Sequence, residues 1–208
     1  AKFLAAGTII TPITSNSAVE TSGKFAVVRT KVGSPYVIEA MLASVKAGRD
    51  KVIGFEANGG VLTQTKFHTA GGALSALPTR DSFLPILATL ATARSMGQAL
   101  SKTAASFALK AALADRIENY PQDRSRSLMA HLQASSDNLS QFLAPIGIVQ
   151  SVDETDGLRV TFANQTVVHL RPSGNAPEMR CYVEAKGEDL ANAVLKQSLT
   201  LLADWSPT

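Results

Sequence analysis

The spacing of apolar residues changes along this 208-residue chain, and the change limits which folds are open to it. In the first half, short β-branched runs alternate with a helical run, which predicts strands at 8–14, 25–30, 51–56 and 61–65 and a helix at 35–47. Strands that alternate with helices are typical of an α/β sandwich. The last third instead holds four successive strand-like segments and one helical run, at 148–152, 158–162, 166–171, 179–184 and 188–203. This pattern predicts an antiparallel sheet with helices on one face, an α+β fold.

The middle of the chain connects these two patterns. A Gly/Ala/Ser-rich stretch at 68–79 predicts a loop, and Asp81 is placed to cap a long helix after it. Residues 107–118 favour a helix by their alanine content, and 123–134 predict a further helix. Helical spacing selects the residues that we expect to face a core: Val37, Met41, Leu42, Val45, Leu84, Leu87, Ala88, Ala91, Ala99, Leu128 and Leu132. We divide the chain into domains 1–110 and 111–208.

Composition excludes several classes of protein. No run approaches the roughly 20 consecutive apolar residues that cross a bilayer, so we expect no membrane partner. Aromatic residues make up 6 % of the chain, and no basic run is interleaved with them, so we expect no nucleic-acid partner. Cys181 is the single cysteine, which rules out an intramolecular disulfide or a thiolate zinc site and indicates a cytoplasmic protein.

The formal net charge of +3 is unevenly distributed. Residues 1–114 carry +7 and residues 115–208 carry −4. The asymmetry indicates either two modules, the first with an anionic partner, or a chance distribution of surface charge. Residues 1–7 resemble neither a signal peptide nor a capped helix start but the tail of a helix, and we expect the chain to be a fragment.

The segment from Arg171 to Arg180 is the most informative for chemistry. An arginine ends one strand, a Pro/Ser/Gly/Asn turn follows, and a second arginine begins the next strand. A guanidinium binds phosphate with two hydrogen bonds, and Ser173, Gly174 and Asn175 offer further donors. The alternative interpretation is an ordinary β-hairpin loop.

A second candidate segment is Gly54-Phe55-Glu56-Ala57-Asn58-Gly59-Gly60. Glu56 and Asn58 are two residues apart at the end of a strand, so both side chains can project on one side of a close-fitting glycine turn. A carboxylate beside an amide suits adjacent sugar hydroxyls. The alternative is a tight turn with an exposed glutamate.

The two segments together resemble one family, the α-D-phosphohexomutases, which include phosphomannomutases and phosphoglucomutases. The sugar-binding loop of that family, G-E-x-S-G, resembles Glu56-Ala57-Asn58-Gly59, and its phosphate loop, R-P-S-G-T-x-P, resembles 171–177. Further similar stretches occur in the same order at 29–37, 79–82 and 180–185, so the resemblance covers nearly the whole chain.

The resemblance implies a four-domain enzyme, of which this chain would be the third domain and a TATA-binding-protein-like fourth domain. The whole enzyme would interconvert hexose 1-phosphate and 6-phosphate through a phosphoserine and a hexose 1,6-bisphosphate, with Mg²⁺. Its phosphoserine and Mg²⁺ loops belong to the first two domains, so we expect no catalytic residue, metal ligand or bound cofactor in this chain. The missing N-terminal domains and a hexose phosphate would be its partners, and 107–118 would be partly extended rather than helical.

The resemblance also assigns roles to residues. Glu56 and Asn58 would hold the sugar's O3 and O4 hydroxyls. The phosphate that is not reacting would be held by Arg171, Ser173, Gly174 and Asn175. Lys31, Ser34 and Arg180 are second-tier candidates for lining the site.

The chain departs from the family pattern at several of these positions. Asn58 replaces the usual serine, Gly60 a common histidine, and Asn175 a threonine. An N-acetylglucosamine or glucosamine phosphate mutase therefore stays open as an alternative, as does a non-catalytic sugar-phosphate-binding module.

The remaining singled-out side chains have structural interpretations. We expect His68, His131 and His169 at the surface. Cys181 should pack on the inner face of the last strand with Met179 and Val183.

Overall fold

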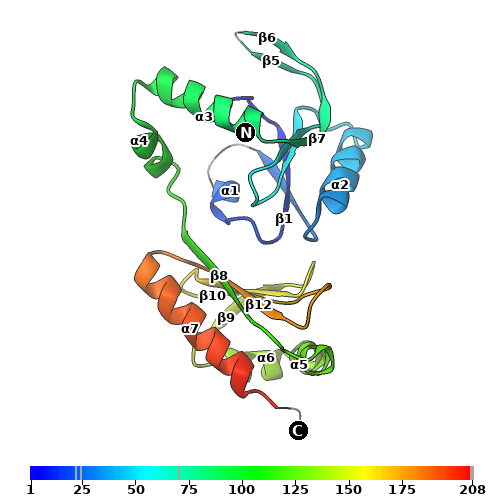
Figure 1. The fold of residues 1–208 in the computed structure, drawn as a ribbon, viewed down its shortest axis with the longest axis vertical. Helices are drawn as coiled ribbons and strands as arrows, with labels where there is room; N and C mark the ends of the chain where they lie inside the picture. The colour runs from blue at the N-terminus through cyan, green and yellow to red at the C-terminus, as the bar shows by residue number, and fades with distance from the viewer. Residues whose placement is uncertain (22, 24, 70, 207–208) are drawn as a thin grey trace. The chain divides into compact units, whose positions relative to one another are not determined.

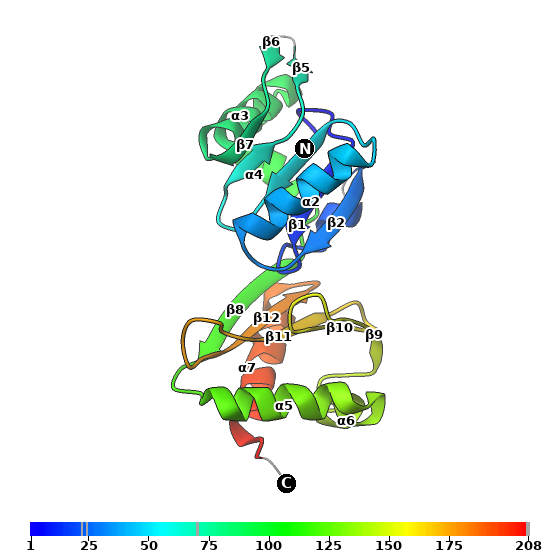
Figure 2. The same ribbon diagram turned by 90° about the vertical axis from the view of Figure 1, so that its right-hand side faces the viewer.

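The computed structural model describes residues 1–206 except 22, 24 and 70 (Figures 1 and 2). The chain forms two compact units, Ala1–Leu109 and Lys110–Thr208. No helix of the described residues is long and apolar enough to cross a membrane.

The first unit is built on a five-stranded sheet with the order β2-β1-β3-β4-β7. Its strands are β1 (Thr8–Pro12), β2 (Ala26–Thr30), β3 (Val52–Phe55), β4 (Val61–Thr63) and β7 (Leu77–Asp81). The first three run parallel, whereas β4 and β7 pair antiparallel. Its helices are α1 (Ala18–Thr21), α2 (Ser34–Lys46), α3 (Phe83–Met96) and α4 (Leu100–Ala105).

Two apolar layers cover the two faces of this sheet. Side chains alternate along a strand, so Ile9 and Ile10 of β1 point to opposite faces. Ile10 packs with Val37 and Met41 of α2, whereas Ile9 packs in a cluster that includes Leu84 of α3. Figure 1 shows α2 and α3 on opposite sides of the strands, the α/β sandwich that the sequence predicts.

The prediction of a loop at 68–79 is wrong. A hairpin of β5 (Phe67–Thr69) and β6 (Gly72–Leu74) precedes β7 there. Phe67 is buried and packs with Leu74 in the first unit's core. Strands of three residues are too short to give a recognisable alternation in a Gly/Ala-rich stretch.

The helix α2 turns a different face to the sheet from the one expected. Val37 and Met41 are buried as predicted, but Leu42 and Val45 are exposed and Ser44 is buried instead. The spacing of 37, 41 and 44 is the i, i+4, i+7 stripe of a helix that meets the sheet along a narrow contact.

The expected core face of α3 is only partly correct. Leu84 packs on the core and Ala88 and Ala91 are half-buried, whereas Leu87 is exposed and Ala99 lies outside the helix. The helix is apolar on all sides, so spacing could not select its inner face.

The predicted capping role of Asp81 is confirmed. Its Oδ1 accepts hydrogen bonds from the backbone N–H of Phe83 at 2.7 Å and of Leu84 at 3.2 Å. These bonds satisfy two donors at the start of α3 that have no partner within the helix.

Residues 1–6 form a turn with the hydrogen bonds that commonly end a helix. The Ala6 N–H donates to the Ala1 carbonyl and the Ala5 N–H to the Lys2 carbonyl, with Ala5 at φ 47°. This pair of bonds around a left-handed residue is the Schellman arrangement.

The second unit is an antiparallel sheet with the order β8-β12-β11-β10-β9. Its strands are β8 (Ala111–Ile117), β9 (Val149–Asp153), β10 (Leu158–Phe162), β11 (Val167–Pro172) and β12 (Met179–Ala185). The helices α5 (Gln122–Ala134), α6 (Ser136–Leu143) and α7 (Glu188–Asp204) cover one face (Figure 2). The expected α+β fold is thus present, with Leu128 and Leu132 buried in its core.

Two elements of this unit differ from what local sequence predicts: β8 is a strand where helical propensity favoured a helix, and α6 was not predicted at all. Residues 111–117 form strand β8, as the family resemblance implied, because pairing along all of β12 overrides their helical propensity. Helix α6 was not predicted; its N-cap is Ser135, whose Oγ accepts the Asn138 N–H. The predicted packing of Cys181 with Met179 and Val183 is confirmed, since all three are buried in one core.

Candidate functional site

The loop after β3 is a tight turn closed by its own backbone. The Glu56 N–H donates to the Gly60 carbonyl at 3.1 Å, and the Gly59 N–H donates to the Glu56 carbonyl at 3.0 Å. Gly59 has φ +89°, a conformation that favours glycine. The Asn58 Oδ1 accepts the Gly60 N–H at 3.1 Å, which holds the side chain against the turn. Asn58 itself is exposed.

Glu56 is not the exposed glutamate of an ordinary turn. It is 8 % exposed, and its Oε2 accepts hydrogen bonds from the Ser34 Oγ at 2.8 Å and from the Arg80 Nη2 at 3.2 Å. The same Nη2 donates to the Ser34 Oγ at 3.1 Å. Three segments distant in sequence therefore meet at one carboxylate oxygen: the start of α2, the end of β3 and the strand β7.

Arg80 is the residue of this cluster that the sequence did not single out. It belongs to the stretch 79–82 that contributed to the family resemblance, but no role was assigned to it. Because residues 68–79 were predicted to be a loop, the sequence did not indicate that Arg80 lies on β7, in the same sheet as β3. Lys31, by contrast, is exposed, and its Nζ lies 6.0 Å from the centre of the Tyr36 ring rather than at Glu56.

The second candidate loop joins β11 to β12 in the other unit. The Ser173 N–H donates to the Glu178 carbonyl at 2.9 Å, which closes the loop, and the Asn175 N–H lies 3.4 Å from the Ser173 Oγ. Ser173 is buried, whereas Gly174 and Asn175 are exposed. A side chain at Gly174 would have no atom within 4 Å, so the loop tip is open.

A row of arginines lies beside this loop. Strand pairing sets Arg171 opposite Arg180, and Arg180 opposite Arg116, on one face of the sheet. Arg180 contacts the Glu178 carboxylate at 3.2 Å, and the Arg116 Nε lies 3.3 Å from the other oxygen of that carboxylate. Each arginine of this row is paired with a carboxylate: Arg171 with Asp156, Arg180 with Glu178, and Arg116 with Glu118 and Glu178.

Arg171 is the most enclosed of the three. Its Nε lies 2.8 Å from the Asp156 Oδ2 but off the line of a hydrogen bond. The side chain is 17 % exposed, against 36 % for Arg180 and 51 % for Arg116. The contact holds the guanidinium by charge and leaves its hydrogen-bond directions incompletely used.

The expected surface position of His169 is wrong. The residue is 2 % exposed, stacks on Tyr182 with ring centres 5.4 Å apart, and contacts the Asp156 carbonyl through Nε2 at 2.6 Å. Burial, aided by the charges of Arg159 and Arg171, lowers the pKa of His169. His68 and His131 are exposed as predicted.

No group of three or more His, Cys, Asp or Glu side chains in the described part of the chain could hold a metal ion. The magnesium that the resemblance implies for the whole enzyme finds no ligand set among these residues.

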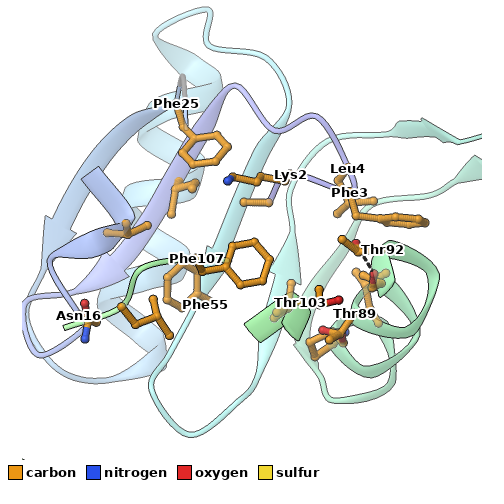
Figure 3. A pocket seen from close by; sticks show the side chains of 18 residues that line it. Lys2, Phe3, Leu4, Asn16, Phe25, Phe55, Thr89, Thr92, Thr103 and Phe107 are labelled. Carbon is orange, nitrogen blue, oxygen red and sulfur yellow. Dashed lines mark hydrogen bonds between the residues drawn. The ribbon is translucent and has the colours of Figure 1, made fainter. Parts of the chain in front are cut away.

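The first unit also contains a cavity of about 330 Å³ (Figure 3). Its lining is mostly apolar and includes Phe3, Phe25, Phe55 and Phe107. None of the residues predicted for sugar or phosphate binding lines it.

Two family models match the chain and together span most of it. The model described as phosphoglucomutase/phosphomannomutase, alpha/beta/alpha domain III, matches residues 1–110. The model described as phosphoglucomutase/phosphomannomutase, C-terminal domain, matches residues 109–200.

Curated relatives point the same way. A phosphomannomutase of Sinorhizobium fredii (strain NBRC 101917 / NGR234) is 52 % identical over 202 residues, covering 97 % of this chain and 43 % of the relative. A phosphomannomutase of Salmonella muenchen is 37 % identical over 197 residues, covering 92 % of this chain and 40 % of the relative. The chain thus spans less than half the length of these relatives.

A solved structure shares the fold. The phosphoglucomutase/phosphomannomutase family protein of Burkholderia thailandensis superposes with a TM-score of 0.63 at 14 % identity, covering 97 % of this chain and 39 % of that one.

Proposed function

Because the chain belongs to the phosphoglucomutase/phosphomannomutase family, as its third and C-terminal domains, we propose that it is the C-terminal half of a phosphomannomutase-like enzyme. The whole protein would interconvert hexose 1-phosphate and hexose 6-phosphate. The identity of 52 % to a phosphomannomutase, over nearly the whole chain, is the observation that carries this proposal.

The proposed sugar site is the loop 56–60. Glu56 and Asn58 would bind the O3 and O4 hydroxyls of the hexose, with the carboxylate accepting from both. The fixed, largely buried carboxylate of Glu56 supports this role, because an acceptor that is already oriented loses little conformational freedom when a sugar binds. Ser34 would act through its hydrogen bond to Glu56, and Lys31 would be a more distant charge.

The proposed phosphate site is the loop 171–175. Arg171 would supply the charge, Ser173 and Asn175 their polar side chains, and Gly174 its backbone N–H, with Arg180 next to them. The open tip at Gly174 and the row of arginines support this role. Arginine suits a phosphate because its planar guanidinium matches two phosphate oxygens.

The chemistry itself requires such a site. In the proposed reaction a phosphoserine of the N-terminal domains gives its phosphoryl group to the sugar, and the resulting hexose 1,6-bisphosphate turns round before it returns one. Either phosphate must then be held while the other reacts. Binding energy at the distant phosphate can position the reacting end.

The reaction scheme places the phosphoserine and Mg²⁺ outside this chain, so we propose that the 208-residue chain binds substrate but does not turn it over. The test is an assay of the whole protein and of the 208-residue chain with mannose, glucose and N-acetylglucosamine 1-phosphates. We expect turnover by the whole protein and none by the 208-residue chain. Turnover by the 208-residue chain would contradict the proposed division of labour.

Arg171→Ala in the whole protein isolates the phosphate site. Removing a charged contact to phosphate should raise KM and lower kcat, at a cost of about 2–5 kcal/mol in kcat/KM. Unchanged kinetics would refute the proposed role of Arg171.

Asn58 favours one alternative within the same reaction class. An exposed amide at this position could hydrogen-bond an N-acetyl group, so an N-acetylglucosamine or glucosamine phosphate mutase is the second candidate. The substrate panel separates the two, since the preferred sugar has the highest kcat/KM. Binding without turnover by the whole protein would instead favour a non-catalytic module. The cytoplasmic location and the absence of nucleic-acid and membrane partners stay predictions.

A further inference from the structure

The side chain of Arg80 occupies the space that a side chain at position 60 would need. A Cβ atom placed on Gly60 would lie 2.2 Å from the Arg80 Cγ and 2.6 Å from its Cδ. Gly60 does not have the positive φ that favours glycine, so backbone conformation is not what excludes other residues there. A side chain at position 60 would therefore displace the stem of Arg80 from its present path over the turn.

The end of that stem is fixed at the carboxylate of Glu56. The Arg80 Nη2 donates to the Glu56 Oε2 and to the Ser34 Oγ, so one guanidinium nitrogen joins both partners. The Arg80 side chain is 51 % exposed, whereas that of Glu56 is 9 % exposed. An exposed ion pair contributes little to stability, but a hydrogen-bonded charge on a buried carboxylate sets its orientation.

The two oxygens of Glu56 have different surroundings. Oε2 accepts both hydrogen bonds, whereas within the described residues no donor bonds to Oε1. A carboxylate held in this way presents one oxygen in a fixed direction. A ligand hydroxyl would meet an acceptor that needs no rearrangement.

We propose that Arg80 is a positioning residue of the sugar site, which acts through Glu56. Gly60, which has no side chain, leaves the space that the Arg80 side chain occupies. Arg80 holds Oε2 so that Oε1 faces the sugar hydroxyls, and Gly60 keeps the path of the arginine open. This inference rests on the proposed function.

The test compares variants of the whole protein by steady-state kinetics with its preferred hexose phosphate. Arg80→Ala should raise KM and lower kcat/KM by about 10- to 100-fold, the usual cost of a lost hydrogen bond to a charged group. Arg49→Ala, an exposed arginine of the same unit, is the matched control and should leave both parameters unchanged. Arg80→Lys should recover part of the loss, because it restores the charge without the planar fork.

Gly60→Ala tests the placement of Arg80 without removing any charge. The added methyl group should displace the arginine stem and lower kcat/KM in the same direction as Arg80→Ala. In the Arg80→Ala background, Gly60→Ala should have no further effect, because nothing is left to displace. An equal loss in both backgrounds would overturn the inference.

A second cycle separates positioning from a structural role. Arg80→Ala should add nothing to Glu56→Gln if the arginine acts through the glutamate. Losses in kcat/KM that add, or a change in melting temperature with unaltered kinetics, would mean that Arg80 only supports the fold. If the wild-type protein is active and the Arg80→Ala variant is equally active, this inference is overturned but the proposed function is not. A wild-type protein that neither binds nor converts hexose phosphates overturns the proposed function and, with it, this inference.

Discussion

Arg171 and Arg180 occupy directly paired positions on β11 and β12, so two positive side chains stand side by side on one face of the sheet. Like charges placed opposite each other destabilise an antiparallel pair. Asp156 beside Arg171 and Glu178 beside Arg180 offset part of that repulsion. A bound anion would offset more of it, which fits a phosphate site at the end of these strands.

Inorganic phosphate or sulfate is therefore expected to stabilise the chain against heat. At ten times its dissociation constant, an anion that binds only the folded state adds about 1.4 kcal/mol. The measurement is the melting temperature with added phosphate against sodium chloride of equal ionic strength. Arg171→Ala should abolish the difference, whereas Arg126→Ala, which removes an exposed arginine of the same unit, should retain it. An equal rise in all three proteins would place the anion elsewhere.

The fold could be predicted where an element is long enough to show a period and has one buried and one solvent-exposed face, because its apolar and polar residues then alternate regularly. Strands β10 and β12 alternate clearly, because one face packs on helices. Strand β8 could not be predicted from its alanine-rich sequence, since its pairing with β12 is a tertiary effect that local propensity does not contain. The hairpin of β5 and β6 could not be predicted either, because strands of three residues are too short to show an alternation of apolar and polar residues.

The residue types of the candidate site were readable, but their contacts were not. The glycine turn drew attention to Glu56, and the family resemblance drew attention to Ser34. That these two meet Arg80 depends on the position of β7 in the sheet, which the predicted loop left out. His169 was misplaced for a related reason: strand alternation cannot foresee that Asp156 contacts it from the neighbouring turn.

Glu56 should affect the handling of sugar and not that of phosphate. Glu56→Ala in the whole protein removes the hydroxyl acceptor and leaves Arg80 and Ser34 without their shared partner, so kcat/KM for the hexose phosphate should fall by at least about 10-fold. Inhibition by inorganic phosphate should be unchanged, because that anion needs no sugar contact. A variant in which only phosphate inhibition changes would contradict the assignment.

Cys181 should be unreactive until the second unit unfolds. Burial raises the pKa of this thiol to about 12, so at pH 8 only about one molecule in ten thousand carries the reactive thiolate. An aromatic disulfide reagent should label native protein very slowly and denatured protein at once, with one thiol per chain. Rapid labelling under native conditions would show that the core around β12 opens readily.

His169 should make the stability of the second unit depend on pH. Its Nε2 faces a backbone carbonyl, so that nitrogen carries the hydrogen, and Nδ1 is buried without a hydrogen-bond partner in the described part of the chain. Protonation would place a charge in a buried site beside Arg159 and Arg171, and burial is the main reason that the pKa of His169 is lowered.

Since the folded-state pKa lies below the unfolded value of about 6.5, the unfolded chain binds the proton more readily. The contribution of His169 to stability is therefore fully present above about pH 6.5 and declines as the pH falls towards the folded-state pKa, by at most about 1.4 kcal/mol per pH unit. Urea unfolding between pH 7.5 and 5, followed by the fluorescence of Trp205 in the same core, measures this decline. His169→Gln should lack that component, whereas His68→Gln, at an exposed position of the first unit, should follow the wild type. Parallel curves for the wild type and His169→Gln would show that burial of His169 does not set its protonation.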